Sequence, residues 1–275
     1  MTGHPWTGHP TAVPTADRVA EPARGGVVRQ TLRDELERMR ARHPDRAPLI
    51  LDVGGGTGAW AVPLARYGCA VTVVDNSPDA LAALHRRASD AGVDSMVTAV
   101  QGDVDALTDV VPPGGADLVL GHGLLEVVDD AGAAVAALAQ AAAPGAAVSV
   151  LVAGRYAAVL ARTLSGKLGE AMAVLSDPHG RFGTDDGLRR RLDAAELRGL
   201  LEAAGLDVEV LQGDGVLEAW VPGAVRDGGP TAARSIADLE ALAAAADPLR
   251  DVATRLHALA RRPVPASDTP HDPAA

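Results

Sequence analysis

The sequence predicts an α/β protein whose sheet has seven strands, mostly parallel, with a terminal antiparallel hairpin strand and helices on both faces. Short apolar runs alternate with segments of helical spacing between residues 49 and 153, which is typical of parallel strands connected by helices. Near the C-terminus, runs at 206–211 and 216–221 flank Gly213-Asp214-Gly215. Glycine and aspartate between two apolar runs predict a hairpin.

Length and composition favour one domain. The chain has 275 residues, of which 47% are hydrophobic, enough to bury one sizeable core. We expect the domain to span residues 25–262. Residues 1–24 have too little apolar content to fold alone, and both this segment and residues 263–275 are predicted to be disordered tails. The histidines His4 and His9 fall in the first of these tails, where we expect solvated side chains and no metal.

Charge and cysteine content exclude several classes of partner. The formal net charge is -11 and the pI is about 5.1, so the protein repels polyanions at long range. The single cysteine, Cys69, excludes an internal disulfide framework and a multi-cysteine zinc site. Neither a signal sequence nor a membrane-spanning run is expected. We therefore predict a cytoplasmic protein, either a monomer or a homodimer.

The first half of the chain has clear local signals. Val28, Leu32, Leu36 and Met39 predict an amphipathic helix over 26–43 that Pro44 ends. A second helix is predicted over 60–67, and a third begins after the Ser77-Pro78 cap. Pro144-Gly145 is expected to stop an alanine-rich helix over 131–143. The predicted strands in this half are 49–53, 69–75, 96–100, 116–121 and 146–152.

The second half is predicted as a lid, a helix, the hairpin and further helices. Residues 155–175 have helical spacing and 176–187 have turn composition, so we expect a lid of about 155–190 over the mouth of the sheet. Asp193-Ala194-Ala195-Glu196 is a capping box for a helix that Gly205 closes. Residues 234–261 are predicted to form one or two amphipathic helices, interrupted at Asp247-Pro248.

The most informative stretch is the glycine-rich turn after the first strand. Four glycines in five residues suit a bend where a ligand approaches bare backbone, and the following helix start favours a negative group. Gly54, Gly56 and Ala59 fit a dinucleotide fingerprint, whereas Asp52, Gly54, Gly56 and Gly58 fit D-x-G-x-G-x-G. A glycine-rich turn without a ligand is the third interpretation.

Two acids reinforce the idea of a nucleoside-containing ligand. Asp75 ends the second predicted strand, 21 residues after Gly54, where a carboxylate can accept hydrogen bonds from both ribose hydroxyls. Asp103 follows the third strand and can hold an adenine amine, with a backbone N–H beside it, or act as a helix cap. We therefore expect a cofactor site that also includes Asn76, Gly102 and Val104.

Candidate substrate contacts come from later strand ends. His122 follows the fourth strand, where ligands bind in open α/β sheets, so it faces cofactor or acceptor, or is a structural histidine bonded to backbone. The lid offers candidate substrate contacts, each of which is alternatively an ordinary loop side chain. These are Tyr156, His179, Arg181 and Phe182.

With these motifs, residues 26–222 resemble the class I S-adenosylmethionine-dependent methyltransferases, which have a Rossmann-like sheet. Four segments are similar to the bacterial tRNA 5-carboxymethoxyuridine methyltransferase branch: 26–30, 52–56, 122–126 and 193–205. The likeness implies that Arg29, Gly54 and Gly55 contact the methionine moiety of S-adenosyl-L-methionine. It also implies that Asp75 binds the ribose, that Asp103 lies at the adenine, and that His122 lines the cofactor pocket.

The predicted function is methyl transfer from S-adenosyl-L-methionine to an oxygen, carboxylate or hydroxyl, of a small molecule or modified nucleoside. A carboxylate needs no base, whereas His122 or His179 could take the proton of a hydroxyl or amine. A tRNA wobble-uridine acceptor is disfavoured, because the branch's arginine-bearing hairpin is here Gly215-Val216-Leu217-Glu218-Ala219. An NAD(P)-dependent oxidoreductase and a non-catalytic cofactor-binding protein are the alternatives from other classes.

Overall fold

The computed structural model describes residues 26–265 and confirms the predicted fold class. Its seven-stranded sheet has the order β3-β2-β1-β4-β5-β7-β6. The first five of these strands are parallel, and β7 runs antiparallel to both β5 and β6. The strands are β1 (Leu49–Val53), β2 (Ala70–Asp75), β3 (Val97–Gln101), β4 (Ala116–His122), β5 (Ala142–Ala153), β6 (Asp207–Asp214) and β7 (Arg255–Arg261).

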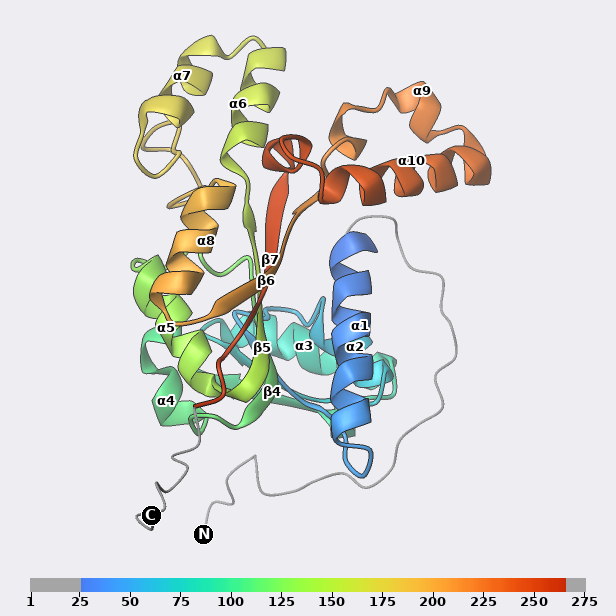
Figure 1. Ribbon diagram of the computed structural model, residues 1–275, viewed down its shortest axis with the longest axis vertical. Coiled ribbons are helices and arrows are strands. Elements are labelled where there is room, and N and C mark those ends of the chain that lie inside the picture. Colours follow the sequence, from blue (N-terminus) through green and yellow to red (C-terminus); the bar gives the residue numbers. More distant parts are fainter. Residues whose placement is uncertain (1–25, 266–275) are drawn as a thin grey trace, which may run out of the picture.

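Helices cover both faces of the sheet and extend beyond one end of it (Figure 1). The α-helices are α1 (Gly26–Arg42), α2 (Ala61–Arg66), α3 (Pro78–Asp90), α4 (Leu107–Val110), α5 (Ala131–Ala141), α6 (Arg155–Leu164), α7 (Leu168–Ser176), α8 (Ala194–Ala203), α9 (Gly223–Arg226) and α10 (Gly229–Ala244). Short 3-10 turns are η1 (Asp94–Met96), η2 (Val104–Ala106), η3 (Glu218–Trp220) and η4 (Leu249–Val252).

The sheet separates two apolar layers. On one face, Leu138 of α5 and Leu197 of α8 pack with Val148 of β5. On the other, Leu32 of α1 and Leu84 of α3 belong to a second cluster. Each helix contributes an apolar stripe because its buried residues recur at three- and four-residue intervals. The pairs α6–α7 and α9–α10 stand beyond these layers, at the top of Figure 1.

The predicted hairpin between 206–211 and 216–221 is wrong. Residues 207–214 form one uninterrupted strand, β6, and residues 218–220 form a 3-10 turn. Gly213 does not turn the chain: a side chain there would lie 2.7 Å from Cβ of Ala253, so this glycine permits close packing. The antiparallel partner is instead β7, and the chain between the two strands contains α9 and α10.

The prediction of helix up to residue 261 is also wrong, because residues 255–261 form β7. The helical part, α10, ends at Ala244, and the predicted interruption at Asp247-Pro248 lies in the connection that follows. All five residues from Leu256 to Ala260 are buried. A strand buried on both faces does not alternate apolar and polar side chains, so periodicity does not distinguish it from a helix.

Smaller corrections concern two boundaries. The alanine-rich helix α5 ends at Ala141, and Pro144-Gly145 lies within β5, which begins at Ala142. The lid contains two helices, because Gly166 has a φ of 72° and breaks the expected single segment between α6 and α7.

The predicted tails 1–24 and 263–275 lie outside the described residues, apart from residues 263–265. Between residues 26 and 265, no helix combines the length and apolar character that crossing a membrane requires.

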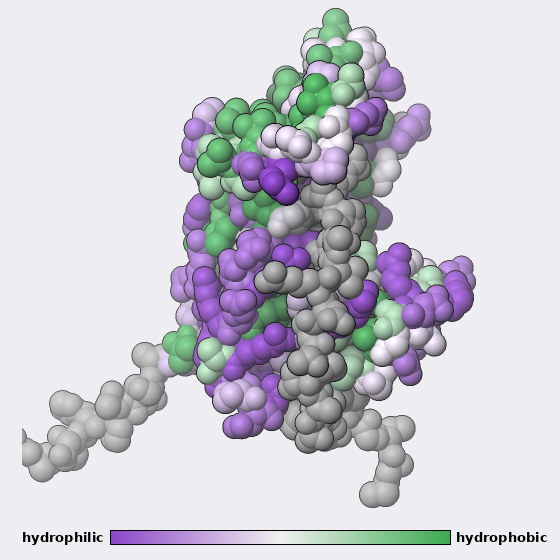
Figure 2. Space-filling view, turned by 90° about the vertical axis from the view of Figure 1, so that its right-hand side faces the viewer, coloured by the Kyte–Doolittle hydropathy of each residue, from purple (hydrophilic) through white to green (hydrophobic). Residues whose placement is uncertain are grey.

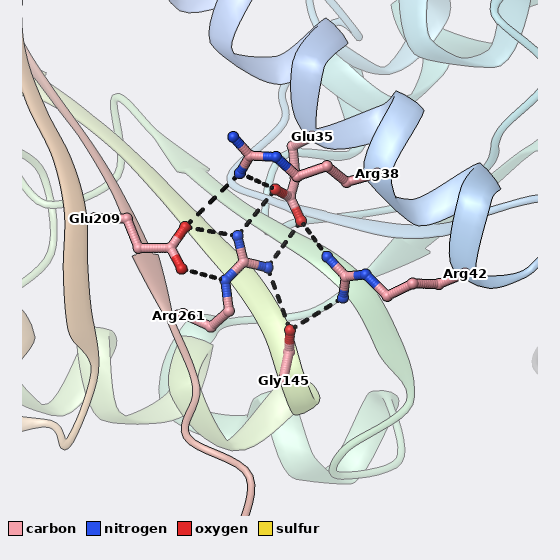
Figure 3. A network of polar contacts seen from close by, with 6 residues as sticks. All are labelled: Glu35, Arg38, Arg42, Gly145, Glu209 and Arg261. Carbon is pink, nitrogen blue, oxygen red and sulfur yellow. Dashed lines mark hydrogen bonds and ion pairs between the residues drawn. The ribbon is translucent and has the colours of Figure 1, made fainter.

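A buried carboxylate fixes α1 to the far edge of the sheet (Figure 3). Glu35 is fully buried and forms two hydrogen bonds with Arg261 of β7, at 2.8 and 2.9 Å. Arg261 also pairs with Glu209 of β6, at 2.6 and 2.7 Å. Arg38 and Arg42 approach Glu35 from its own helix, at 3.1 and 3.4 Å. The buried charges are therefore paired on several sides.

Glu35→Gln is expected to lower the free energy of unfolding by about 3 kcal/mol, because it leaves a partly buried guanidinium without one carboxylate. Urea denaturation measures this change. Glu37→Gln is the matched control, since Glu37 is exposed on the same helix and should change stability by less than about 0.5 kcal/mol. Equal effects of the two substitutions would show that the network does not hold α1.

Candidate functional site

The glycine-rich turn follows β1 and brings bare backbone to the edge of a cavity. Gly54 has a φ of 69°, and its N–H donates to the carbonyl of Val74 at 2.7 Å. A Cβ on Gly54 would lie 3.1 Å from Cδ1 of Leu124. The left-handed backbone and the crowded position both favour glycine here. A ligand at this point therefore meets the main chain of the bend.

The neighbouring glycines serve packing within the bend. A Cβ on Gly55 would lie 2.5 Å from a carboxylate oxygen of Asp52. A Cβ on Gly58, whose φ is 78°, would lie 2.3 Å from Cδ1 of Leu84 in α3. These two positions tolerate no side chain because the strand and helix beneath them are already in contact.

Asp75 joins the turn after β1 to the turn after β2. Its Oδ2 accepts a hydrogen bond from the N–H of Gly56, and its Oδ1 accepts one from the N–H of Ser77, both at 2.9 Å. Each carboxylate oxygen can accept more than one hydrogen bond. Asp75 therefore keeps acceptor capacity toward the cavity that it lines.

The cavity has a volume of about 420 Å³, within the usual range for small-molecule sites. Six of its lining residues were predicted from the sequence: Gly54, Asp75, Asn76, Gly102, Asp103 and Val104. Asp103 also caps η2, accepting from the N–H of Asp105 at 3.2 Å, so both of its interpretations are compatible. The other predicted residues are not among the lining residues: Arg29, Asp52, Gly55, Gly56, Gly58, His122 and the four lid residues.

The opposite wall of the cavity was not predicted. It comes from the loop after β4, including Gly123, Val128 and Asp129, and from Arg189. The neighbouring Arg190 holds this loop: its guanidinium donates to the carbonyls of Leu125, Val128 and Asp129 at 2.5 to 2.7 Å. The position of the loop could be expected from the rule on strand ends. Nothing in the sequence signals the two arginines, which are brought in by the segment before α8.

Asp52 is a buried acid with an unusual charge state. Its side chain is 1% exposed, and both carboxylate oxygens lack a hydrogen-bond partner among the described residues. Burial, together with the nearby charge of Asp75, raises the pKa of Asp52 to about 7. The carboxyl group thus changes charge near neutral pH, directly beneath the glycine bend.

His122 ends β4 beside the cavity rather than in its lining. Its Nε2 lies 2.8 Å from Oγ of Ser149, and its ring meets Trp60 edge-on at 4.7 Å. Nδ1 is buried without a partner within residues 26–265. Burial, together with the proximity of the His257 ring and the charge of Arg255, holds the pKa of His122 well below its ordinary value. The sequence left open a structural histidine bonded to backbone. In the structure, His122 is bonded to the side chain of Ser149 instead.

Two further polar groups come from α1 and from the loop after β4. The guanidinium of Arg29 stacks over the Trp60 ring at 5.6 Å, so α1 brings Arg29 to a face of that indole. Glu126, four residues after His122, has one buried carboxylate oxygen without a partner among residues 26–265, and burial raises its pKa. The sequence pattern gave no reason to single out Glu126.

The lid residues are in two different situations. Tyr156 is the second residue of α6, and its hydroxyl lies 3.5 Å from Asp193. Phe182 instead lies against Arg162, at 3.9 Å, and near Arg191, at 5.6 Å. The backbone N–H groups of His179 and Arg181 both donate to Asp177. Phe182, His179 and Arg181 thus make contacts within the lid itself.

Comparison with known proteins agrees with this geometry. Residues 50–145 match the model of a family described as "Methyltransferase domain". Over these residues the chain is therefore similar to methyltransferase domains. No curated protein matches the sequence.

Solved structures share the fold at low identity. A SAM-dependent methyltransferase from Methanosarcina mazei has a TM-score of 0.54 and 15% identity, over 79% of this chain and 93% of that one. Phosphoethanolamine N-methyltransferase 2 from Haemonchus contortus, in complex with S-adenosyl-L-methionine, has a TM-score of 0.51 and 17% identity, over 84% and 52%. The [4+2]-cyclase SpnF has a TM-score of 0.52 and 20% identity, over 86% and 83%.

The cofactor, S-adenosyl-L-methionine, fits the residues present. Its amino-acid end needs approachable backbone and its ribose needs an acceptor, and the cavity offers Gly54 and Asp75. Its cationic centres suit a cavity edge that carries several carboxylates, among them Asp75, Asp103 and Asp129.

Asp75→Ala is expected to weaken S-adenosylhomocysteine binding by about 2–3 kcal/mol, because a charged hydrogen-bond acceptor is lost. Isothermal titration calorimetry measures the change. Asp90→Ala is the control, because Asp90 is an exposed acid at the end of α3 and does not line the cavity. Unchanged affinity in Asp75→Ala would reject its assignment to the ribose.

Asp52 is expected to make stability depend on pH. Between its unfolded pKa of about 3.8 and its folded pKa of about 7, the folded state holds a proton that the unfolded state has released. Stability is therefore lost as pH rises through this window, by up to about 4 kcal/mol at 1.36 kcal/mol per pKa unit. Asp52→Asn should remove this loss of stability. The free energy of unfolding of the variant in urea, relative to that of the native protein, should therefore increase from pH 4 to pH 8. Parallel pH curves for the two proteins would contradict the assignment.

Proposed function

We propose that this methyltransferase domain transfers the methyl group to an oxygen atom of a small molecule or modified nucleoside. The observation that carries the proposal is the cavity at the carboxyl ends of β1, β2 and β4, which joins the glycine bend to the acids Asp75 and Asp103. In this proposal Gly54 receives the methionine moiety, Asp75 the ribose and Asp103 the adenine. The acceptor then lies beside His122, toward the ends of β4 and β5.

The protein itself needs to supply little covalent chemistry in this reaction. Bound S-adenosyl-L-methionine supplies an electrophilic methyl group on a sulfonium. The chain must hold the acceptor oxygen in line with it and exclude water. Trp60 and the lid helix α6, which begins directly after β5, are suited to both tasks. Tyr156 is the lid side chain that we assign to acceptor contact.

The surface of the lid favours an acceptor with an apolar part. Five large apolar side chains of α6 and α7 are more than a third exposed: Leu160, Leu164, Leu168, Met172 and Leu175. Figure 2 shows hydrophobic residues gathered in the upper part of the molecule and mainly polar ones below. Together with a net charge of -11, this supports a small molecule over tRNA, whose phosphates need cationic contacts. The tRNA wobble-uridine acceptor is therefore the second candidate.

Tritium-labelled S-adenosyl-L-methionine tests the acceptor class. The protein is incubated in parallel with small-molecule cell extract and with bulk tRNA, and transferred label is counted. We expect label in the small-molecule fraction. Mild alkali then separates the two oxygen types, because it releases methanol from a methyl ester and leaves a methyl ether intact. Label in tRNA would replace the first candidate by the second.

A thermal-shift comparison separates the other classes of function. S-adenosylhomocysteine should raise the melting temperature and NADH should not, because binding to the folded state alone stabilises it. A shift with NADH would favour an oxidoreductase. A shift with S-adenosylhomocysteine but no labelled product from any fraction would favour a cofactor-binding protein without methyl transfer.

A further inference from the structure

A line of polar side chains crosses the buried sheet from α1 to the candidate site. Oγ1 of Thr31 lies 2.9 Å from Nε2 of Gln212, which lies 2.9 Å from Nδ1 of His257. Nε2 of His257 lies 2.8 Å from Oγ of Ser149, and Ser149 lies 2.8 Å from Nε2 of His122. The line thus runs through β6, β7, β5 and β4, which are adjacent in the sheet.

The direction of the hydrogen bonds is set at the α1 end. The Thr31 hydroxyl donates its single hydrogen to the carbonyl of Val27, at 3.1 Å. Toward Gln212 the Thr31 oxygen can then only accept, so the NH₂ group of Gln212 faces it. The same Nε2 faces His257, and an amide nitrogen donates. Nδ1 of His257 is therefore a hydrogen-bond acceptor.

The direction then propagates through two histidines. Burial and the charge of Arg255 lower the pKa of His257 to about 3, so this ring is neutral and carries its one hydrogen on Nε2. That hydrogen goes to Ser149, and the Ser149 hydroxyl hydrogen goes to Nε2 of His122. Because the buried His122 ring is also neutral, its remaining hydrogen is on Nδ1.

We propose that the relay Thr31–Gln212–His257–Ser149 fixes His122 as the neutral Nδ1–H tautomer, which donates a hydrogen bond to a carboxylate of the bound ligands. Nδ1 is buried and has no partner among residues 26–265, and a buried donor costs free energy unless it is satisfied. Ser149, His257 and Gln212 are positioning residues for His122. This inference rests on the proposed function for the identity of the ligand.

The proposal changes the role first expected of His122. Nε2 already accepts from Ser149 and Nδ1 carries a hydrogen, so neither nitrogen can take a proton from the acceptor. The reaction then suits an acceptor that arrives as an anion, such as a carboxylate. Two carboxylates could meet the donor, that of the cofactor's methionine moiety and that of the acceptor.

Nuclear magnetic resonance of ¹⁵N-histidine-labelled full-length protein, without ligand, tests the tautomers directly. Protonated and unprotonated ring nitrogens differ strongly in chemical shift. We expect His122 to carry its hydrogen on Nδ1 and His257 on Nε2, with neither ring becoming charged between pH 6 and pH 8. A hydrogen on Nε2 of His122, or a charged ring in this range, overturns the proposal.

Gln212→Glu provides a test that a merely structural role would not pass. A carboxylate at 212 accepts from His257, so every hydrogen bond of the relay reverses and the His122 hydrogen moves to Nε2. Ser149→Ala is the second variant and removes the donor to Nε2. Gln101→Glu is the control for added charge, because Gln101 is exposed at the end of β3. An unchanged His122 tautomer in both relay variants overturns the proposal.

Calorimetry with two probes identifies the carboxylate. S-adenosylhomocysteine retains the amino acid, and 5′-methylthioadenosine lacks it. If the donor serves the cofactor, Gln212→Glu should weaken S-adenosylhomocysteine binding about tenfold and leave 5′-methylthioadenosine unchanged. If tautomer reversal leaves both affinities unchanged, the assignment of the donor to the cofactor's carboxylate is overturned. Equal weakening of both probes overturns the assignment to a carboxylate.

Failure of this inference and failure of the proposed function are distinguishable. The tautomer measurement needs neither ligand nor turnover. If the native protein does not bind S-adenosylhomocysteine, the proposed function fails. If it binds this ligand but His122 carries its hydrogen on Nε2, the relay is refuted and the proposed function stands.

Discussion

The candidate site depends on the two backbone hydrogen bonds that Asp75 accepts. By binding the N–H groups of Gly56 and Ser77, one carboxylate fixes the turns after two neighbouring strands. These turns form one wall of the cavity, and Gly54 lies at its edge because the bend is held there. The opposite wall has an equivalent restraint, since Arg190 binds three carbonyls of the loop after β4. A charged side chain that binds backbone groups thus fixes each of these two walls of the cavity.

The other side of the sheet is organised by β7, which lies between β5 and β6. It contributes Arg261 to the buried pair with Glu35 and His257 to the polar line that ends at His122. Both contacts involve α1, through Glu35 and Thr31. The helix that carries Arg29 is therefore fixed to the sheet at two levels. Through these contacts, the packing of α1 against the sheet is connected to the hydrogen bonds of His122.

Features that depend on neighbouring residues were predicted from the sequence. The glycine bend, the Ser77 cap and the capping box at Asp193 each involve hydrogen bonds or backbone angles within a few residues. The acids Asp75 and Asp103 were found because parallel strands place their carboxyl ends at one edge. Six cavity residues follow from these local patterns.

The tertiary structure alone decided which distant segments meet. Residues 256–260 are all buried and do not alternate apolar and polar side chains, so their sequence does not distinguish helix from strand, and pairing with β5 and β6 makes them a strand. Arg189 and His257 reach the site region from segments far along the chain, through contacts that no local pattern encodes. Sequence determined the bend and its acids, because short-range geometry specifies them. The fold determined the second wall and the polar line, because these depend on strand order.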